Sequence, residues 1–465
     1  MHRFLSRTTT TRCIQAILLV WMLALFISRS HDMAQSLPAD WSGGDEQLWI
    51  ASGYYYSNLL LHGDFTRKKW DGTISMRGMG SLNMHLGKLL VGLPLVAWGG
   101  HQSIGYYTCT LPLDENLRLG NVPAVSALRF ARGMTTLWSV LCCLIIFIIC
   151  LSCTNAWGGL LAVALLVTNE WFIEFGSSAT VDIHYNAFLL CCCAAGYGLL
   201  TATGRASLLR AAAVMGIAAG CADSIKITGL MLASTFFIAL AVYRGHGTGG
   251  AKKILVPVAT FVLTALSVIY LLNPCFWPEW RGLHEPGTGR VGSAEVPAPA
   301  QPGSPTRMKS TPLTHGFRPL GLPVMYLRWN EGMALQAMRY EEDWGGERLK
   351  YRTFHRRLLL GWSSFRLEWV FLLIGIASCL RGIGVSYRQG ILSRRAVPLA
   401  YFGVNYLFIL FFMKLNWDRY YLPTILAGIP LVVIGIVSIA TAARMQFATL
   451  LNRNSPSPAC AERDR

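Results

Sequence analysis

Charged residues are scarce in this sequence. Of its 465 residues only 14% are Asp, Glu, Lys or Arg, whereas 53% are hydrophobic. A soluble domain carries roughly 25% charged residues. The shortfall is concentrated in uncharged stretches of about the length that crosses a bilayer. The sequence therefore excludes an ordinary soluble enzyme and predicts a protein whose core is built against lipid.

Motifs of soluble nucleotide chemistry are also lacking. No GxGxxG follows a predicted strand, and there is no P-loop. No CxxC pair lies beside histidines in a loop, which argues against structural zinc. Most of the 13 cysteines lie in apolar stretches, where they behave as small hydrophobic residues. Cys109 and Cys275 fall in segments predicted to lie outside the membrane, where one disulfide between them is an option.

Basic residues, by contrast, are in excess, and the formal net charge is +17. In a soluble protein this excess would suggest nucleic acid. Because no soluble basic domain is present, we predict no nucleic-acid partner. Membrane orientation and an anionic lipid ligand explain the charge better.

About ten apolar segments are predicted to span the membrane, which makes the chain an all-α polytopic membrane protein. Basic residues precede the first segment; a cleaved signal peptide is the alternative, but no convincing cleavage site follows. If successive segments cross the membrane in alternate directions, the short basic loops lie on the same side as the N-terminus. Both termini are therefore predicted to be cytoplasmic in a multi-pass cell (inner) membrane protein, with the endoplasmic-reticulum membrane as the alternative for a eukaryotic source. The segments cover roughly residues 13–27, 134–151, 158–178, 183–203, 211–243 (two spans broken near Asp223 and Lys226), 254–272, 369–380, 396–413 and 422–443.

Three regions follow from this pattern. Residues 1–272 form an N-terminal transmembrane module whose first outer loop covers about residues 30–132. Residues 273–368 form a long outer loop; its first half is rich in Pro, Gly, Ala and Ser and reads as flexible, and residues 326–366 are expected to form surface helices. Residues 369–465 supply the last spans and a cytoplasmic tail. The apolar segment 86–100 is too short to cross and is predicted to lie in the outer interface.

Acidic residues gather on the predicted outer face. Asp45 and Glu46 open a helical segment, where negative charge also stabilises a helix N-terminus without any catalytic role. The functional interpretation is a carboxylate that acts as general base at the membrane surface. Asp182 lies between two spans and is either a helix cap or a functional acid. Glu170 and Glu174 are predicted on one face of the span before it.

Three cations are predicted at the same depth on that face. Arg132 adjoins the second span, Lys226 interrupts two apolar segments, and Arg419 occupies the short loop before the last span. Each alone is most simply a snorkelling anchor. Together they suit the phosphate of a lipid head group. A metal site of His and Asp is an alternative that no ligand spacing supports.

Five segments of the chain resemble, in order, the C-type glycosyltransferase superfamily, most closely the protein O-mannosyltransferases and the lipid A aminoarabinose transferases (glycosyltransferase family 39-like). They are GDEQLWIASGYYYSNLLLHGDF, LGKLLVGLPLVAWGG, GGLLAVALLVTNEWFIEFGSSATVD, GIAAGCADSIKITGLML and DRYYLPTILAGIPLVV. The paired prolines of the family's interfacial motif are absent, since this chain reads NMHLGK. The long outer loop is also too short for the β-trefoil domain of eukaryotic protein mannosyltransferases, which favours a bacterial-type enzyme.

The resemblance implies an inverting glycosyltransferase with a C-type (GT-C) membrane fold. Its donor would be a polyprenyl-phosphate sugar of the dolichyl or undecaprenyl type, and its acceptor a hydroxyl of a protein, a lipid or a glycan. The resemblance makes Asp45 the general base, Glu46 the residue that positions the acceptor, and Asp182 the residue that orients the acceptor or a cation. The predicted substrate-binding residues are Arg132, Lys226, Arg419, His85 and Lys88. The chemistry is compatible with a divalent cation and does not require one. The active site is predicted on the periplasmic or, more generally, the extracytoplasmic face of the membrane.

Other functions fit parts of the pattern. A transporter or flippase of lipid-linked sugar also needs cations on the outer face, but it usually shows internal repeats and mid-bilayer charges, which this sequence lacks. A membrane scaffold would leave the acidic pair and the cations without a purpose. A polymerase or ligase of surface polysaccharide would keep the same fold.

Overall fold

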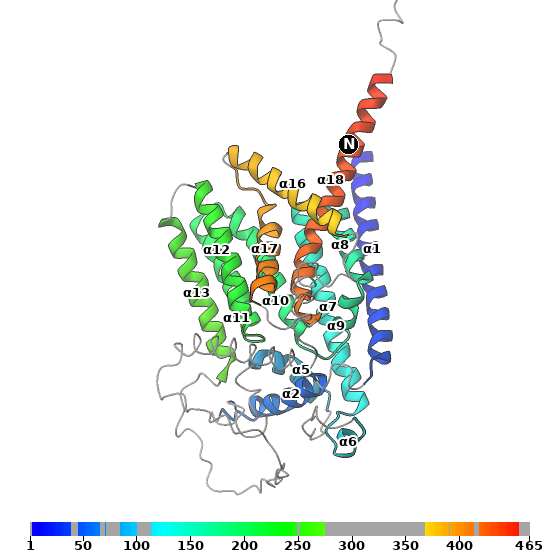
Figure 1. Ribbon diagram of the computed structural model, residues 1–465, viewed down its shortest axis with the longest axis vertical. Helices are drawn as coiled ribbons and strands as arrows, with labels where there is room; N and C mark the ends of the chain where they lie inside the picture. Colours follow the sequence, from blue (N-terminus) through cyan, green and yellow to red (C-terminus); the bar gives the residue numbers. More distant parts are fainter. Residues whose placement is uncertain are drawn as a thin grey trace, which may run out of the picture.

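The computed structural model describes residues 2–38, 45–65, 70, 84–99, 113–248, 252–274, 368–389, 391–412 and 418–454. Within these residues the chain is helical and contains no strand. Most of the helices form one bundle, and three short ones lie at one end of it (Figure 1). The helices of the bundle are α1 (His2–Ser36), α7 (Val125–Cys153), α8 (Ala156–Thr168), α9 (Glu170–Gly176), α10 (Asp182–Thr201), α11 (Arg205–Asp223), α12 (Gly229–Thr248), α13 (Lys252–Leu272), α16 (Glu368–Arg388), α17 (Ala396–Phe411) and α18 (Leu422–Asn454).

Each predicted span coincides with a helix or a helix pair of the bundle, which confirms the all-α multi-pass class. Eight helices of the described chain are long and apolar enough to cross a membrane, and the bent pair α8–α9 makes a ninth. The tenth predicted segment is α17, which has 16 residues and is shorter than the ~20 residues that a helix needs to cross perpendicularly. The break predicted within residues 211–243 separates α11 from α12.

The bend between α8 and α9 differs from the sequence prediction of one straight span. The two helices meet at 72°, and Asn169 is the residue between them. Its side chain caps α9 by accepting a hydrogen bond from the backbone N–H of Phe172 at 2.9 Å, as Asn favours at an N-cap. Glu170 is therefore the first residue of α9, where its charge complements the helix dipole, and not a residue inside a continuous span.

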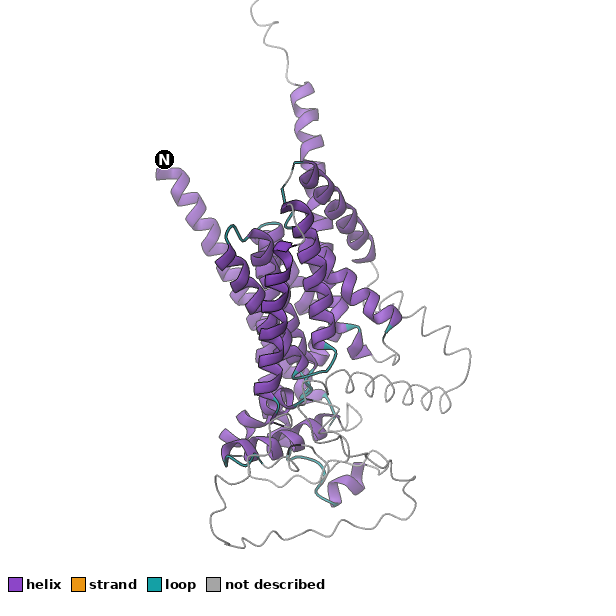
Figure 2. Cartoon of the chain, turned by 90° about the vertical axis from the view of Figure 1, so that its left-hand side faces the viewer, coloured by secondary structure: helices purple, strands orange, loops and turns teal. Residues whose placement is uncertain are grey.

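Three short helices lie beyond one end of the bundle: α2 (Asp45–Leu61), α5 (His85–Ala97) and α6 (Leu113–Arg118). Of these, α2 and α5 lie side by side as a layer across that end, and α6 lies beyond them, as the side view in Figure 2 also shows. The first residues of α1 and the last of α18 lie at the opposite end in both views. One end of the bundle thus carries α2, α5 and α6, and the other end carries the start of α1 and the end of α18.

The crossing of α2 and α5 depends on two glycines. A Cβ built on Gly92 would collide with the carbonyl group of Gly53, and one built on Gly53 would lie 2.9 Å from the Cα of Gly92. Backbone therefore meets backbone here, a separation that only glycine permits. The N-terminal end of α5 is attached to the bundle as well, because Leu86 N–H donates to the Ser224 carbonyl at 2.9 Å.

Candidate active site

The first two residues of α2 are adjacent acids with different surroundings. The side chain of Glu46 is fully buried and pairs with Arg132, which is 2% exposed. Its two oxygens accept from Arg132 Nε at 2.9 Å and Nη2 at 2.7 Å. The backbone N–H of Ala179 donates to the same carboxylate at 2.6 Å. Glu46 therefore joins α2 to α7 and to the segment after α9.

Arg132 makes further bonds to the end of α1. Its Nη1 donates to the carbonyls of Ala34 at 2.8 Å and Leu37 at 2.9 Å, and its Nη2 donates to that of Pro38 at 2.9 Å. A guanidinium has five N–H groups, and all five of Arg132 are used by protein acceptors.

These contacts bear on two sequence predictions, which stay predictions. Arg132 was predicted to bind a phosphate, and in the structure its five N–H groups donate to Glu46 and to the end of α1. Glu46 was predicted to position the acceptor, and in the structure its side chain is fully buried within an ion pair. Both residues fix the start of α2, and with it the neighbouring Asp45.

Asp45 is accessible, in contrast to Glu46. Its side chain is 30% exposed and forms an ion pair with Arg419, which is 19% exposed and lies in the short helix η3 (Asp418–Tyr420). The pair joins the start of α2 to the segment before α18, two parts of the chain that are 374 residues apart. Burial lowers the pKa of Arg419, but attraction to Asp45, Tyr420 and Asp182 outweighs this, so that the pKa is raised.

A second ion pair lies next to the first. Lys226 Nζ is 2.5 Å from Asp182 Oδ1, and Asp182 also interacts electrostatically with Arg419. Signs therefore alternate through Asp45, Arg419, Asp182 and Lys226, which we call the charge cluster. It gathers residues from α2, η3, the start of α10 and the turn after α11 at the end of the bundle that carries α2 and α5.

Aromatic rings line the charge cluster. Lys226 Nζ lies 5.6 Å from the ring centroid of Tyr420 and 5.8 Å from that of Tyr185. Arg419 Cζ is also 5.6 Å from the Tyr420 ring, within the range of cation–π attraction. Burial raises the pKa of Tyr420 to about 12, against an opposing effect of Arg419. The phenol therefore stays protonated at neutral pH.

The side chain of Asp182 does not cap α10, which was the structural alternative to a functional role. The N-cap of α10 is Val181, and no side chain caps that helix. The carboxylate of Asp182 instead accepts from Lys226. Two of the three cations predicted at one depth, Lys226 and Arg419, therefore meet in the charge cluster, and Arg132 belongs to the separate buried pair.

His85 and Lys88 lie on α5 and face α2. Both are buried, at 0% and 1% exposure. Lys88 Nζ lies 4.6 Å from the ring centroid of Tyr56, and His85 Nε2–H donates to the carbonyl of Trp70 at 2.9 Å. The backbone N–H of His85 donates to Asn273 Oδ1 at 3.0 Å. The structure thus places both residues in the α2–α5 layer, and their contact with substrate stays a prediction.

Burial gives His85 a specific pH dependence. Desolvation and the charge of Lys88 lower its pKa to about 3, against the ordinary value of 6.5. Below pH 6.5 the unfolded chain binds a proton that the folded protein refuses, so stability falls as pH decreases toward 3, by at most about 1.4 kcal/mol per pH unit from this residue. We expect the melting temperature of His85→Gln in detergent to fall less between pH 7 and pH 5 than that of the parent. His62→Gln, at an exposed residue just after α2, should keep the parental slope; equal slopes in all three proteins would contradict the prediction.

Sequence reasoning missed several residues of this region. Tyr420 and Tyr185 beside the cations carried no motif that separated them from the other tyrosines of the chain. Asn273 was assigned to a loop, yet its side chain also donates to Ser224 Oγ at 3.0 Å. Its position directly after α13 was the available signal, because a polar residue at the end of a span meets the interface.

Some predictions fall on residues that the structure does not describe. These are the Cys109–Cys275 pair, most of the loop 273–368 and the surface helices at 326–366. Within the described part of the chain, no three His, Cys, Asp or Glu side chains come close enough to hold a metal ion.

Comparisons with known proteins give one distant structural likeness. No family model matches the chain, and no curated protein sequence matches it. Among solved structures the chain is similar to the archaeal oligosaccharyltransferase AglB from Archaeoglobus fulgidus, in complex with an inhibitory peptide and a dolichol-phosphate, at 10% identity and a TM-score of 0.46. The match covers 94% of this chain and 52% of that one, so the chain spans about half of its length. A likeness of this degree assigns neither a family nor an activity.

Proposed function

We propose that the protein is an inverting membrane glycosyltransferase that moves a sugar from a polyprenyl-phosphate carrier to an acceptor hydroxyl. The observation that carries the proposal is the charge cluster, in which the accessible carboxylate of Asp45 pairs with Arg419 and the neighbouring Asp182 pairs with Lys226, at one end of an apolar bundle. A lipid carrier needs this arrangement, because its chain stays in the bilayer while its phosphate meets protein charge at the edge. The resemblance of five sequence segments to C-type glycosyltransferases points the same way.

In the proposed reaction Asp45 takes the proton of the acceptor hydroxyl. The acceptor oxygen attacks the anomeric carbon from the face opposite the phosphate and forms the new glycosidic bond. The bond between that carbon and the phosphate oxygen breaks, and its electron pair leaves with polyprenyl phosphate. Lys226 and Arg419 stabilise the charge that grows on the leaving phosphate. No step needs a divalent cation.

The ion pairs of the charge cluster imply that binding of the donor also activates the carboxylates. Arg419 pairs with Asp45 and Lys226 with Asp182. A carrier phosphate competes with both carboxylates for these cations. Donor binding therefore draws Arg419 from Asp45 and frees the base to accept a proton, while Asp182 becomes available to orient the acceptor.

The remaining proposals concern the membrane topology and the acceptor. We propose that the cluster faces the extracytoplasmic side of a cell membrane and that both termini are cytoplasmic, as the charges of the short loops favour. The acceptor is a hydroxyl of a protein, a lipid or a wall glycan. Mannosyl transfer to protein and sugar transfer to lipid A are the reactions that the sequence resemblance favours.

The donor class is the first thing to test. We expect the purified protein to transfer label from radiolabelled polyprenyl-phosphate sugars to acceptors in membrane extract of the source organism, and not from nucleotide sugars. Lys226→Met should weaken use of the carrier by about tenfold, as a lost charge-assisted phosphate contact predicts. Transfer from a nucleotide sugar would overturn the proposal. Tight binding of carrier without any transfer would favour a transporter of lipid-linked sugar.

A further inference from the structure

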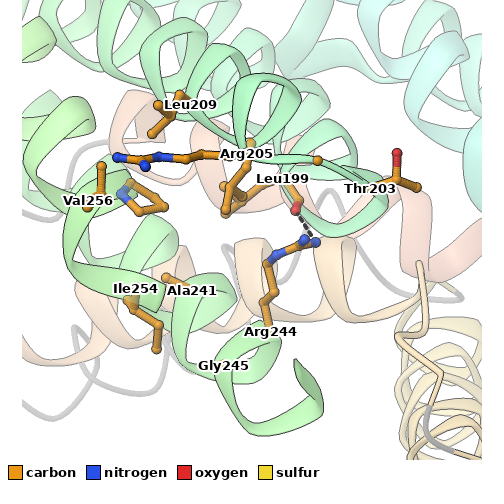
Figure 3. A pocket seen from close by; sticks show the side chains of 12 residues that line it. Leu199, Thr203, Arg205, Leu209, Ala241, Arg244, Gly245, Ile254 and Val256 are labelled. Carbon is orange, nitrogen blue, oxygen red and sulfur yellow. Dashed lines mark hydrogen bonds between the residues drawn. The ribbon is translucent and has the colours of Figure 1, made fainter. Parts of the chain in front are cut away.

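A second feature lies at the end of the bundle opposite the charge cluster. There α10 ends, α11 begins, α12 ends and α13 begins, and the four ends surround a cavity of about 540 Å³ (Figure 3). Most of the side chains that line it are apolar, and two are arginines. The lining residues are Leu199, Thr203, Gly204, Arg205, Leu208, Leu209, Ala241, Arg244, Gly245, Ile254, Val256 and Pro257.

The two arginines have different roles. Arg244 donates to the carbonyls of Leu199 at 2.8 Å, Leu200 at 2.9 Å and Ala202 at 2.7 Å. It thereby satisfies the last carbonyls of α10 and forms a wall of the cavity. Arg205 is exposed and extends across the cavity toward Val256 (Figure 3). No carboxylate of the described residues forms an ion pair with it.

The position of the cavity along the helices sets its depth in a membrane. The helices α10 and α11 have 20 and 19 residues, or about 30 Å each, which equals the thickness of the hydrocarbon core. The charge cluster lies at the start of α10 and just after the end of α11, so the cavity lies at the opposite membrane surface. Its apolar lining then adjoins acyl chains, and Arg205 lies at head-group level.

Charge at this site favours an anion. Arg205 is the first residue of α11, where the helix dipole already contributes positive potential, and a cation there gains nothing from the helix. A phosphate beside Arg205 would be attracted both by the guanidinium and by the positive potential at the start of α11. The neighbouring Gly204 has nothing within 4 Å of a built Cβ, so a head group has room beside it. A volume of 540 Å³ falls within the range of ligand pockets.

We propose that this cavity binds an anionic glycerophospholipid, with an acyl chain against the apolar lining and the phosphate at Arg205. An apolar recess at the membrane surface is better filled by hydrocarbon than by water, and the guanidinium selects a negatively charged head group. The site is separate from the charge cluster and does not depend on the proposed transferase activity.

The test counts bound lipid by native mass spectrometry of the whole protein. The protein is extracted in detergent, delipidated, and titrated with phosphatidylglycerol or with phosphatidylcholine of the same acyl chains. We expect phosphatidylglycerol to bind at least about fivefold more tightly, the factor that one arginine at a membrane surface supplies. Arg205→Gln should abolish this preference. Val256→Trp, at a lining residue that is 43% exposed, should block the cavity and reduce binding of both lipids.

Arg210→Gln is the matched control, because Arg210 is an exposed arginine of α11 outside the lining, and it should bind like the parent. The inference is overturned if the two lipids bind equally, or if Arg205→Gln and Arg210→Gln lose affinity to the same extent. It is also overturned if polyprenyl phosphate, added in a third titration, occupies the site and excludes phosphatidylglycerol.

Discussion

Asp45→Asn is expected to reduce the rate of sugar transfer by at least ~100-fold, the contribution of a general base. Asparagine has the shape of aspartate and an oxygen that can still accept from Arg419, so the fold should persist. The loss should appear in kcat. Donor binding should be retained or tightened, because Arg419 no longer pairs with a carboxylate and is available to the phosphate. Radiolabel transfer under saturating donor, together with carrier binding, measures the two effects separately.

A matched variant keeps this prediction sharp. Asp114→Asn removes an exposed carboxylate from α6, at the same end of the molecule, and should transfer sugar at the parental rate. If Asp45→Asn also keeps that rate, Asp45 is not the base, and Asp182 becomes the residue to test. If Asp45→Asn loses donor binding and activity together, the carboxylate serves to build the site and not to move a proton.

Arg132→Met is expected to destabilise the protein by about 3–5 kcal/mol, because it leaves the buried carboxylate of Glu46 without its partner. It also removes the donors that Arg132 gives to the end of α1. The change should appear as a large fall in melting temperature in detergent. The double variant Glu46→Leu with Arg132→Met carries no unpaired charge and should recover part of the loss.

The control for Arg132 is a pair at the surface. Arg118→Met breaks the ion pair between Arg118 and Glu115, whose side chains are 69% and 34% exposed, and should change the melting temperature little. If Arg132→Met were as stable as the parent but failed to bind carrier, that result would support the predicted role of Arg132 as a phosphate ligand.

Much of the fold could be predicted from composition, since apolar length is a strong signal in membrane proteins. The break between α11 and α12 was visible because Asp223 and Lys226 interrupt a hydrophobic run. The 72° bend at Asn169 was not, because α8 and α9 together have the apolar length of one span. The one polar residue between them, Asn169, leaves the combined stretch apolar enough to be read as one span.

The residues of the charge cluster could be selected from the sequence, but which of them form ion pairs with one another could not. Asp45, Asp182, Lys226 and Arg419 were all selected from the sequence, and the structure brings them together. The choice between Asp45 and Glu46 depended on adjacent positions of one helix, which point in directions about 100° apart. Only the packing of α2 against α7 reveals which acid is buried, and hence that Arg132 belongs to that buried pair.

The contact of Gly53 with Gly92 has a mechanical consequence. Two helices whose backbones touch cannot slide past each other without a clash, so we expect α2 and α5 to move together as a rigid pair. Asp45 is the first residue of α2, and the α2–α5 pair lies across one end of the bundle (Figure 1). A displacement of α5 would therefore also shift Asp45, the proposed general base.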